Sequence, residues 1–325
     1  MSSFRRAAVA VLAALALAAG LALLVRSHST GGERRVLVVG LDGADWQLLD
    51  RYRAAGAMPE LDRLVREGRS GVLRSLVPPL SPLVWTTIAT GTSPLKHRIL
   101  DFTRFNPGTG MREPITSDER RVKAIWEMAS ESERDVAVLG LWATHPAEPV
   151  RGLMVSDRLF SFQHREAQAP AGAVHPASEE ARVLAARAAV ESEVGAAAVR
   201  AYLPWLTDAE YAGLAARSDP FSHPATSLRR ILVETRLYHR LALDWLRTPP
   251  ALAFVYIQGT DMTGHVFAPY APPRQPSIPE ADFERYRGVP EAYFREIDGM
   301  LADYREAAEQ NGATLLIVSD HGFLW

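Results

Sequence analysis

Three short apolar segments, each followed at once by an acidic or histidine-containing turn, constrain the fold of this chain most strongly. They are residues 35–40 (RVLVVG), 252–257 (LAFVYI) and 314–319 (TLLIVS). Segments this short and this rich in β-branched residues are typical of strands buried on both faces of a parallel sheet. Helical patterns occur between them, which favours an α/β domain with a mainly parallel sheet covered by helices.

Weaker patterns extend this domain over residues 35–325. Residues 71–76, 136–140 and 153–156 are predicted to be further strands, and residues 58–68 and 290–310 to be helices. Between residues 158 and 250 the pattern changes to two long helices, 178–203 and 226–247, with Ser178 and either Thr226 or Ser227 as N-caps. This part of the chain is predicted to be a helical insertion or a small cap at one end of the sheet.

The N-terminal residues 1–34 have a different composition. Arg5 and Arg6 precede an uncharged, alanine-rich segment, residues 7–25, and a polar linker follows. At about 1.5 Å per residue, a helix of this length spans most of a hydrocarbon core of roughly 30 Å. We therefore predict an N-terminal hydrophobic helix, either a cleaved export signal or a signal anchor, with the domain membrane-associated or secreted on the extracytoplasmic side, in the periplasm or at the cell surface.

Composition excludes several classes of function. The net charge of -2 and the sequence pI of about 6.5 do not suit a protein that binds nucleic acid. The chain contains no cysteine. Any metal ion must therefore be held by histidine and carboxylate side chains.

Carboxylate and imidazole side chains follow the three strongest strands. Asp42 follows the first strand, Asp261 and His265 follow the second, and Asp320 and His321 follow the third. Because the carboxyl ends of parallel strands lie at one sheet edge, these five groups are expected to converge. Their mixture of oxygen and nitrogen ligands suits zinc or manganese. For each aspartate alone, a turn or an N-cap is the commoner role, and Asp45 is a nearby alternative to Asp42.

A fourth segment, residues 78–91 (PPLSPLVWTTIATG), contains a candidate nucleophile. Ser81 followed by Pro82 predicts a helix that begins there, with Ser81 as the N-cap. Its hydroxyl would lie at the positive end of the helix, where phosphate binds well. On this segment alone, the capping role is the favoured interpretation of Ser81.

Together, and in this order, the four segments VVGLDGAD, PPLSPLVWTTIATGTSPLKHRI, TDMTGH and VSDHGF resemble the alkaline phosphatase superfamily, and within it the type I phosphodiesterase and nucleotide pyrophosphatase branch. The resemblance implies an alkaline-phosphatase-like fold with two divalent metal ions, zinc or alternatively manganese. One ion would be held by Asp42, Asp320, His321 and the Ser81 oxygen; the other would be held by Asp261, His265 and a further histidine. Ser81 would be the nucleophile and would form a phosphoserine intermediate.

The sequence departs from this branch in two places. Phe102 stands in the stretch where the characterised nucleotide pyrophosphatases have a phosphate-binding asparagine, so phosphate binding is expected to differ in detail. The further histidine is expected downstream of Asp320 and His321, which leads us to expect that the sequence is a C-terminally truncated fragment.

We therefore predict a metal-dependent hydrolase of phosphodiesters or phosphomonoesters, acting on a small molecule or a lipid. A phosphomutase or phospho-group transferase of the same superfamily is one alternative, and a catalytically inactive, membrane-tethered binding module is another. Metal content separates the last of these from an enzyme. A sulfatase is disfavoured, because Trp85 occupies the position four residues after Ser81 where a sulfatase has arginine.

Overall fold

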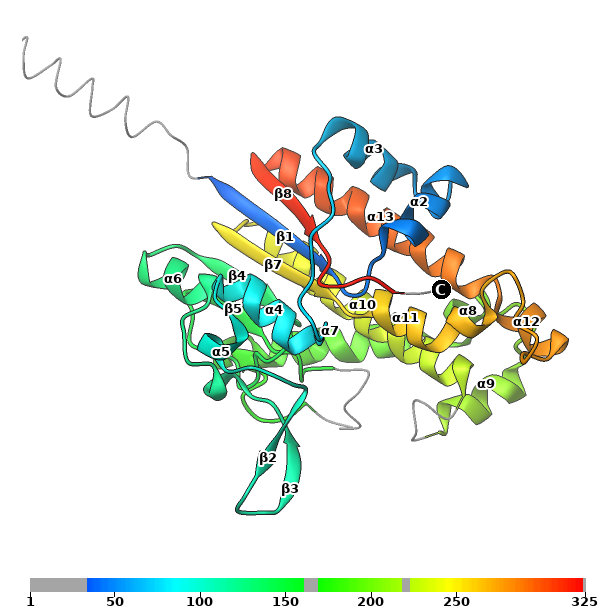
Figure 1. Cartoon of the computed structure of the whole chain (residues 1–325), viewed down its shortest axis with the longest axis horizontal. Helices are drawn as coiled ribbons and strands as arrows, with labels where there is room; N and C mark the ends of the chain where they lie inside the picture. Colours follow the sequence, from blue (N-terminus) through cyan, green and yellow to red (C-terminus); the bar gives the residue numbers. More distant parts are fainter. Residues whose placement is uncertain (1–33, 161–168, 218–222, 324–325) are drawn as a thin grey trace, which may run out of the picture. The chain divides into compact units, whose positions relative to one another are not determined.

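Six strands in the described residues form one sheet in the order β6-β5-β4-β7-β1-β8 (Figure 1). The structure is a computed structural model that describes residues 34–160, 169–217 and 223–323. The strands are β1 (Arg35–Leu41), β4 (Val136–Leu139), β5 (Gly152–Val155), β6 (Val174–His175), β7 (Leu252–Ile257) and β8 (Ala313–Val318).

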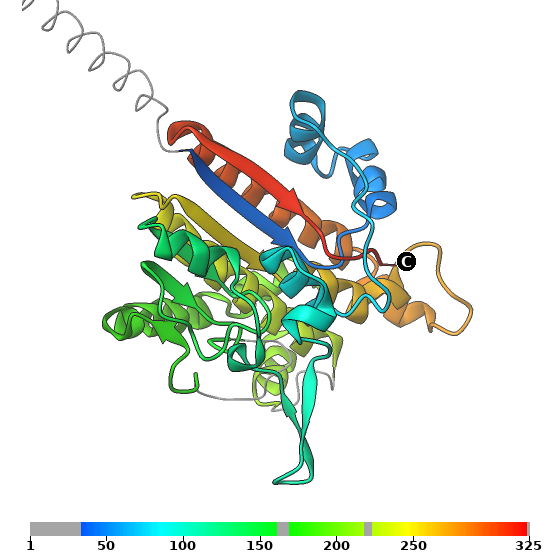
Figure 2. The ribbon, with the colours of Figure 1, turned by 60° about the vertical axis from the view of Figure 1, so that its left-hand side comes forward.

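The sheet is parallel except at one edge, as the sequence predicted in outline. β1 pairs in parallel with both β7 and β8, and β4 pairs in parallel with β7 and β5. Only β6 is antiparallel, to β5, which makes the sheet mixed. The three strands that precede the predicted site residues are therefore neighbours, β7-β1-β8, with their carboxyl ends at the same edge. Figure 2 shows β1, in blue, beside β8, in red.

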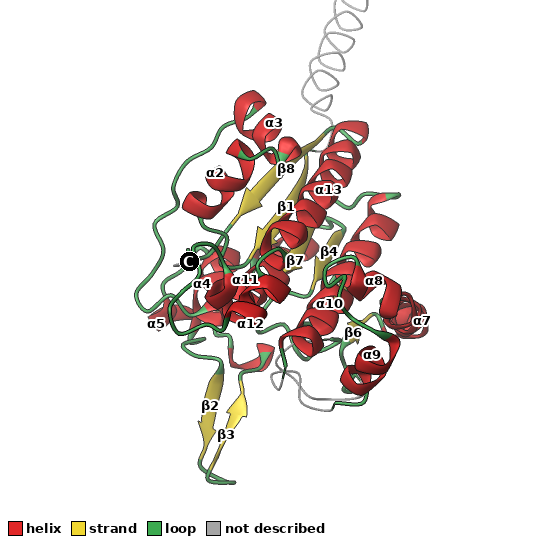
Figure 3. Cartoon of the chain, turned by 90° about the vertical axis from the view of Figure 1, so that its right-hand side faces the viewer, coloured by secondary structure: helices red, strands yellow, loops and turns green. Residues whose placement is uncertain are grey.

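Helices cover both faces of the sheet. On one face, α10 (Pro224–Leu246) contacts β4 and β7, and α13 (Val289–Gln310) contacts β1 and β8 (Figure 3). The side chains of Leu37, Val39 and Leu41 point into the core on this face. On the other face, α4 (Ser81–Thr90) and α6 (Ile125–Glu131) pack over Val38, Phe254 and neighbouring core residues. Alternation along β1 thus supplies two separate cores.

The remaining helices are shorter and lie around these layers. They are α2 (Trp46–Ala54), α3 (Pro59–Glu67), α5 (Pro94–His97), α7 (Glu180–Glu193), α8 (Ala196–Arg200), α9 (Asp208–Ala215), α11 (Gly259–Phe267) and α12 (Glu280–Tyr286), with single 3-10 turns at Ser117–Glu119, Ala177–Glu179 and Ala268–Tyr270. A two-stranded hairpin, β2 (Thr103–Asn106) and β3 (Met111–Pro114), projects away from the sheet (Figure 3).

The predicted strand at residues 71–76 is wrong. This segment has no regular secondary structure, and Val72 and Leu73 are 86% and 62% exposed. Its pattern is typical of a strand, but a strand is stable only when its backbone pairs with a neighbour. Among the described residues, the only hydrogen bond to this segment is donated by Trp46 Nε1 to the Gly71 carbonyl, at 3.2 Å.

The predicted helical insertion is largely helical but differs in three respects. The single helix expected at 178–203 is interrupted, because α7 ends at Glu193 and α8 begins after Gly195. The second helix, α10, is capped by His223, whose Nδ1 accepts a hydrogen bond from Ala225 N at 3.2 Å, so neither Thr226 nor Ser227 is the cap. Strand β6 was not predicted. Because α10 packs on the sheet, this part of the chain contributes to the main core.

The predicted N-terminal hydrophobic helix, residues 7–25, lies outside the described residues. Within the described ranges, no helix combines the length and the apolar character needed to cross a membrane.

Candidate metal centre

The elements around β1 bring all six predicted site residues to one edge of the sheet. Asp42 directly follows β1, and Asp320 lies two residues after the end of β8. Asp261 and His265 lie on α11, which was not predicted as a helix; their spacing of four residues puts them on the same helical face. Gly43 has a φ of 61°, and a Cβ there would come within 2.8 Å of Asp261 Oδ1. Glycine is therefore needed for the turn after β1 to approach α11 this closely.

His321 lies at the centre of the cluster. Its Nε2 is 3.3 Å from Asp42 Oδ1, 3.6 Å from Asp320 Oδ2 and 4.0 Å from Asp261 Oδ1. Asp42, Asp261 and His321 each offer an atom within 4.8 Å of the other two, which is close enough to hold one ion. The resemblance assigns Asp261 to a different ion from Asp42 and His321; in the structure, Asp261 Oδ1 is 4.0 Å from His321 Nε2 and Asp261 Oδ2 is 3.3 Å from His265 Nε2.

The hydroxyl of Ser81 points into this cluster. Ser81 Oγ is 3.3 Å from Asp42 Oδ1 and 3.5 Å from His321 Nε2. The prediction that Ser81 is the N-cap is wrong by one residue: Leu80 is the N-cap, Ser81 begins α4, and the cap makes no side-chain hydrogen bond. The Ser81 hydroxyl is therefore directed at the acidic cluster and does not cap the helix.

Asp261 and His265 form the outer part of the site. His265 Nε2 is 3.3 Å from Asp261 Oδ2, and the His265 side chain is 61% exposed. The His265 ring packs edge-on against Phe323, with the ring centroids 5.0 Å apart. Asp261 therefore directs one oxygen toward His321 and the other toward His265.

The charges in the cluster are crowded and poorly solvated. Burial, reinforced by the negative charge of Asp42, raises the pKa of Asp320 to about 9. Burial alone would lower the pKa of His321, but the hydrogen bond that it donates to Asp42 and the charges of Asp320 and Asp42 raise this pKa to about 10. Burial also raises the pKa of Asp261, although His265 opposes this shift.

These residues fit a divalent cation. Asp261 Oδ1 and Asp320 Oδ2 are buried and have no hydrogen-bond partner in the described part of the chain. Buried carboxylate oxygens are normally paired, hydrogen-bonded or bound to a metal ion. A cation would balance the negative charge and take up the unpaired oxygens, and the donor set of aspartates and histidine suits zinc or manganese.

Other side chains hold the ligands in place. Gly43 N donates to Asp320 Oδ1 at 3.2 Å, and Thr260 Oγ1 donates to the Asp42 carbonyl at 2.5 Å. The hydroxyl of Tyr256, on β7, donates to Asp42 Oδ2. Burial and the nearby Asp42 raise the pKa of Tyr256, so it remains a protonated donor. Sequence reasoning missed Tyr256 and Thr260; every residue of β7 is buried, so its sequence does not distinguish Tyr256 from a core residue.

Three positions that the sequence analysis singled out have structural roles. Asp45 is the N-cap of α2, and its Oδ1 accepts from Gln47 N at 2.7 Å, so Asp42 and not Asp45 belongs to the cluster. Trp85 is fully buried against Phe254 and Tyr256. The position four residues after Ser81, where a sulfatase has arginine, is therefore part of the hydrophobic core in this chain. Phe102 stacks edge-on against Trp142, with the ring centroids 5.2 Å apart.

His97 is also structural. Its side chain is fully buried, its Nδ1 accepts from Ile99 N at 3.1 Å, and its Nε2 is 2.9 Å from Thr87 Oγ1. Because Thr87 donates its own proton to Leu83 O, its oxygen accepts from His97 Nε2–H, and the imidazole is neutral.

Because His97 is buried in its neutral form, we predict that the fold loses stability at acidic pH. Burial, together with the charge of Arg120, lowers the pKa of His97 from 6.5 to about 4. A histidine whose pKa falls on folding contributes its full stability above pH 6.5 and loses it as the pH falls toward 4. We expect His97 to cost roughly 2 kcal/mol of unfolding free energy between pH 7 and pH 5. Chemical denaturation should show a smaller loss in His97→Asn, whereas a substitution of the adjacent, exposed Lys96, Lys96→Gln, should leave the loss unchanged. An equal loss in both variants would contradict this role.

The sequence matches the family described as type I phosphodiesterase / nucleotide pyrophosphatase over residues 36–324. The chain belongs to this family. The match includes all six predicted site residues and confirms the resemblance found in the four segments. No curated protein sequence matches the chain.

Solved structures support the fold assigned to this family member. Two crystal structures of phosphonoacetate hydrolase from Sinorhizobium meliloti 1021, one with phosphonoformate and one with phosphonoacetate, superpose with TM-scores of 0.51 and 0.50. Each is 18% identical to the chain, and each match covers 89% of this chain and 56% of the hydrolase. At this identity the likeness concerns the fold alone, and the chain spans little more than half the length of these structures.

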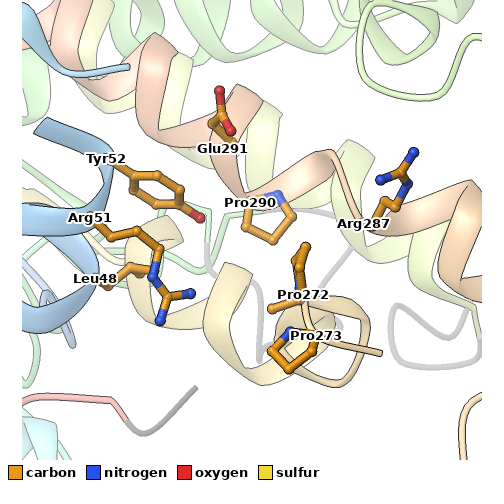
Figure 4. Close-up of a pocket in the computed structure, with 9 residues that line it drawn as sticks. Leu48, Arg51, Tyr52, Pro272, Pro273, Arg287, Pro290 and Glu291 are labelled. Atoms are coloured by element: carbon orange, nitrogen blue, oxygen red, sulfur yellow. The ribbon is translucent and has the colours of Figure 1, made fainter. Parts of the chain in front are cut away.

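A separate cavity of about 480 Å³ lies beside α2 and the start of α13 (Figure 4). Leu48, Arg51 and Tyr52 line one side of it, and Pro272, Pro273 and Pro290 line another. None of the six predicted site residues lines this cavity. The predicted site and this cavity are therefore separate features of the described residues.

Proposed function

We propose that the chain is a metal-dependent hydrolase of phosphoric esters, with Ser81 as the nucleophile. The observation that carries this proposal is the position of the Ser81 hydroxyl within 3.5 Å of both Asp42 Oδ1 and His321 Nε2. A serine hydroxyl directed at a buried acidic cluster, in which Asp261 Oδ1 and Asp320 Oδ2 lack a hydrogen-bond partner among the described residues, suits metal-assisted attack on phosphorus. Membership of the type I phosphodiesterase and nucleotide pyrophosphatase family supports the same reaction class.

The proposed residues divide into two groups. Asp42, Asp320 and His321, with the Ser81 oxygen, would hold one divalent ion; Asp261 and His265 would contribute to a second. When bound, zinc or manganese would supply Lewis-acid stabilisation of the charge that develops on the phosphoryl oxygens. The start of α4 adds the partial positive charge of a helix N-terminus.

In the first step, Ser81 Oγ attacks phosphorus. A bond forms between Ser81 Oγ and phosphorus, the bond from phosphorus to the leaving alcohol oxygen breaks, and the serine proton passes to Asp42 Oδ1, the oxygen to which Ser81 donates. The leaving alkoxide takes up a proton from solvent water. In the second step, a bond forms between a water oxygen and phosphorus, the bond from phosphorus to Ser81 Oγ breaks, Ser81 regains a proton from Asp42, and the water protons pass to solvent, which releases phosphate from a monoester or a phosphate monoester from a diester.

The test is release of the alcohol from an aryl phosphodiester and an aryl phosphomonoester by the full chain. We expect release from at least one ester when zinc or manganese is supplied, at a rate well above the buffer blank. If the metal-loaded protein releases alcohol from neither ester, the proposed reaction is wrong.

A further inference from the structure

The two oxygens of the Asp42 carboxylate have different partners, and Tyr256 is the partner of one of them. Its hydroxyl donates to Asp42 Oδ2. The other oxygen, Oδ1, is 3.3 Å from both Ser81 Oγ and His321 Nε2. One oxygen is therefore occupied by the phenol, and the other faces the nucleophile and the histidine.

The register of the sheet explains this contact. Tyr256 is the partner of Gly40 on the neighbouring strand, and Asp42 lies two residues beyond Gly40. Side chains two residues apart point to the same face of a strand. The tyrosine ring therefore reaches along its own face of the sheet to the next side chain, which is Asp42.

The ring is fixed by the helix that carries Ser81. Trp85, one turn after Ser81 on α4, packs edge-on against Tyr256 with a centroid distance of 5.2 Å and an interplanar angle of 77°. Trp85 is fully buried and Tyr256 is 2% exposed. A Cβ at Gly40 would come within 2.8 Å of the Trp85 ring, so this packing requires glycine there. Trp85 therefore supports the Tyr256 ring, and Ser81 and Tyr256 both contact Asp42.

We propose that Tyr256 is a positioning residue that holds the Asp42 carboxylate in the orientation needed to bind a metal ion. This inference rests on the proposed function, because it gives the phenol a role toward the ion. Without the hydroxyl, Asp42 Oδ2 would be buried without this donor, and the orientation of the carboxylate would depend only on the contacts of Oδ1 with Ser81 and His321. Loss of such a supporting hydrogen bond commonly weakens metal binding tenfold to a hundredfold.

The experiment compares Tyr256→Phe with Tyr238→Phe in the full chain. Tyr238 is a matched control, because it is also buried and its hydroxyl donates to the Ser156 and Phe160 carbonyls, away from the cluster. The dissociation constants of zinc and manganese are measured by competition with a chelating dye, without substrate. We expect Tyr256→Phe to bind each metal about tenfold to a hundredfold more weakly than wild type, and Tyr238→Phe to bind within about threefold of wild type.

The possible results separate the positioning role from the proposed function. Unchanged affinity in Tyr256→Phe, or equal weakening in both variants, overturns the positioning role while the metal site stands. Failure of the wild-type chain to bind metal overturns both. If Tyr256→Phe does not fold, Trp85→Phe decides the question: it loosens the support of the Tyr256 ring, so a measurable weakening supports the role and unchanged affinity overturns it.

Discussion

Replacing Ser81 with alanine is expected to lower the turnover of a phosphoric ester by a factor on the order of a thousand or more. The Ser81 hydroxyl is directed at Asp42 and His321, and it makes no bond that caps α4. Alanine therefore removes the nucleophile without removing a helix cap. Steady-state rates measured on folded, metal-loaded protein are the readout.

Thr86 supplies the matched control for Ser81. It lies on the same helix and is also buried, but its hydroxyl donates to the Pro82 carbonyl at 2.7 Å. Thr86→Ala is expected to lose about 1 kcal/mol of stability or less and to keep its rate within about threefold of wild type. A Ser81→Ala variant that turns over as fast as Thr86→Ala would show that Ser81 is not the nucleophile.

The second large effect is expected in Asp42→Asn. Wild-type protein should retain about one zinc per chain after dialysis, because Asp42, Asp320 and His321 converge with Ser81, whereas Asp261 and His265 offer fewer ligands. Asparagine removes the negative charge at the oxygen that faces both Ser81 and His321. We expect zinc affinity to fall by about a hundredfold or more, and turnover with it.

Asp45→Asn is the control for this substitution. Asp45 lies three residues further along the chain and caps α2 through its side chain. Asparagine caps helices as well as aspartate does, so the fold is preserved. Zinc content and turnover should match wild type in Asp45→Asn. If the two variants lose zinc equally, Asp42 does not hold the ion.

Much of the fold could be predicted because the central strands are buried on both faces. The segments at β1, β7 and β8 have continuous apolar patterns that match the observed bounds to within a residue or two. The segment at 71–76 has the weaker pattern GVLRSL, which was also predicted to be a strand, and it is not one. A local sequence pattern indicates that a segment can form a strand. It does not indicate whether a neighbouring strand is present to pair with that segment.

The candidate metal ligands could be predicted from the sequence, but the side chains that hold these ligands in place could not. Asp42, Asp261 and Asp320 follow adjacent parallel strands, so topology brings them together from any distance in the sequence. Tyr256 was missed because a tyrosine in an apolar strand has the pattern of a core residue. Its contact with Asp42 depends on the register between β1 and β7, which composition and periodicity do not specify.

The measurement that tests the metal-dependent reaction most directly is turnover of an aryl phosphodiester by zinc-loaded protein, before chelation, after chelation and after zinc is returned. Asp261 Oδ1 and Asp320 Oδ2 are buried without a hydrogen-bond partner among the described residues, so the site is expected to work only when metal is bound. We predict that chelation lowers the rate at least about a hundredfold and that zinc restores it. A rate that is unchanged in protein shown to be free of metal would contradict the account.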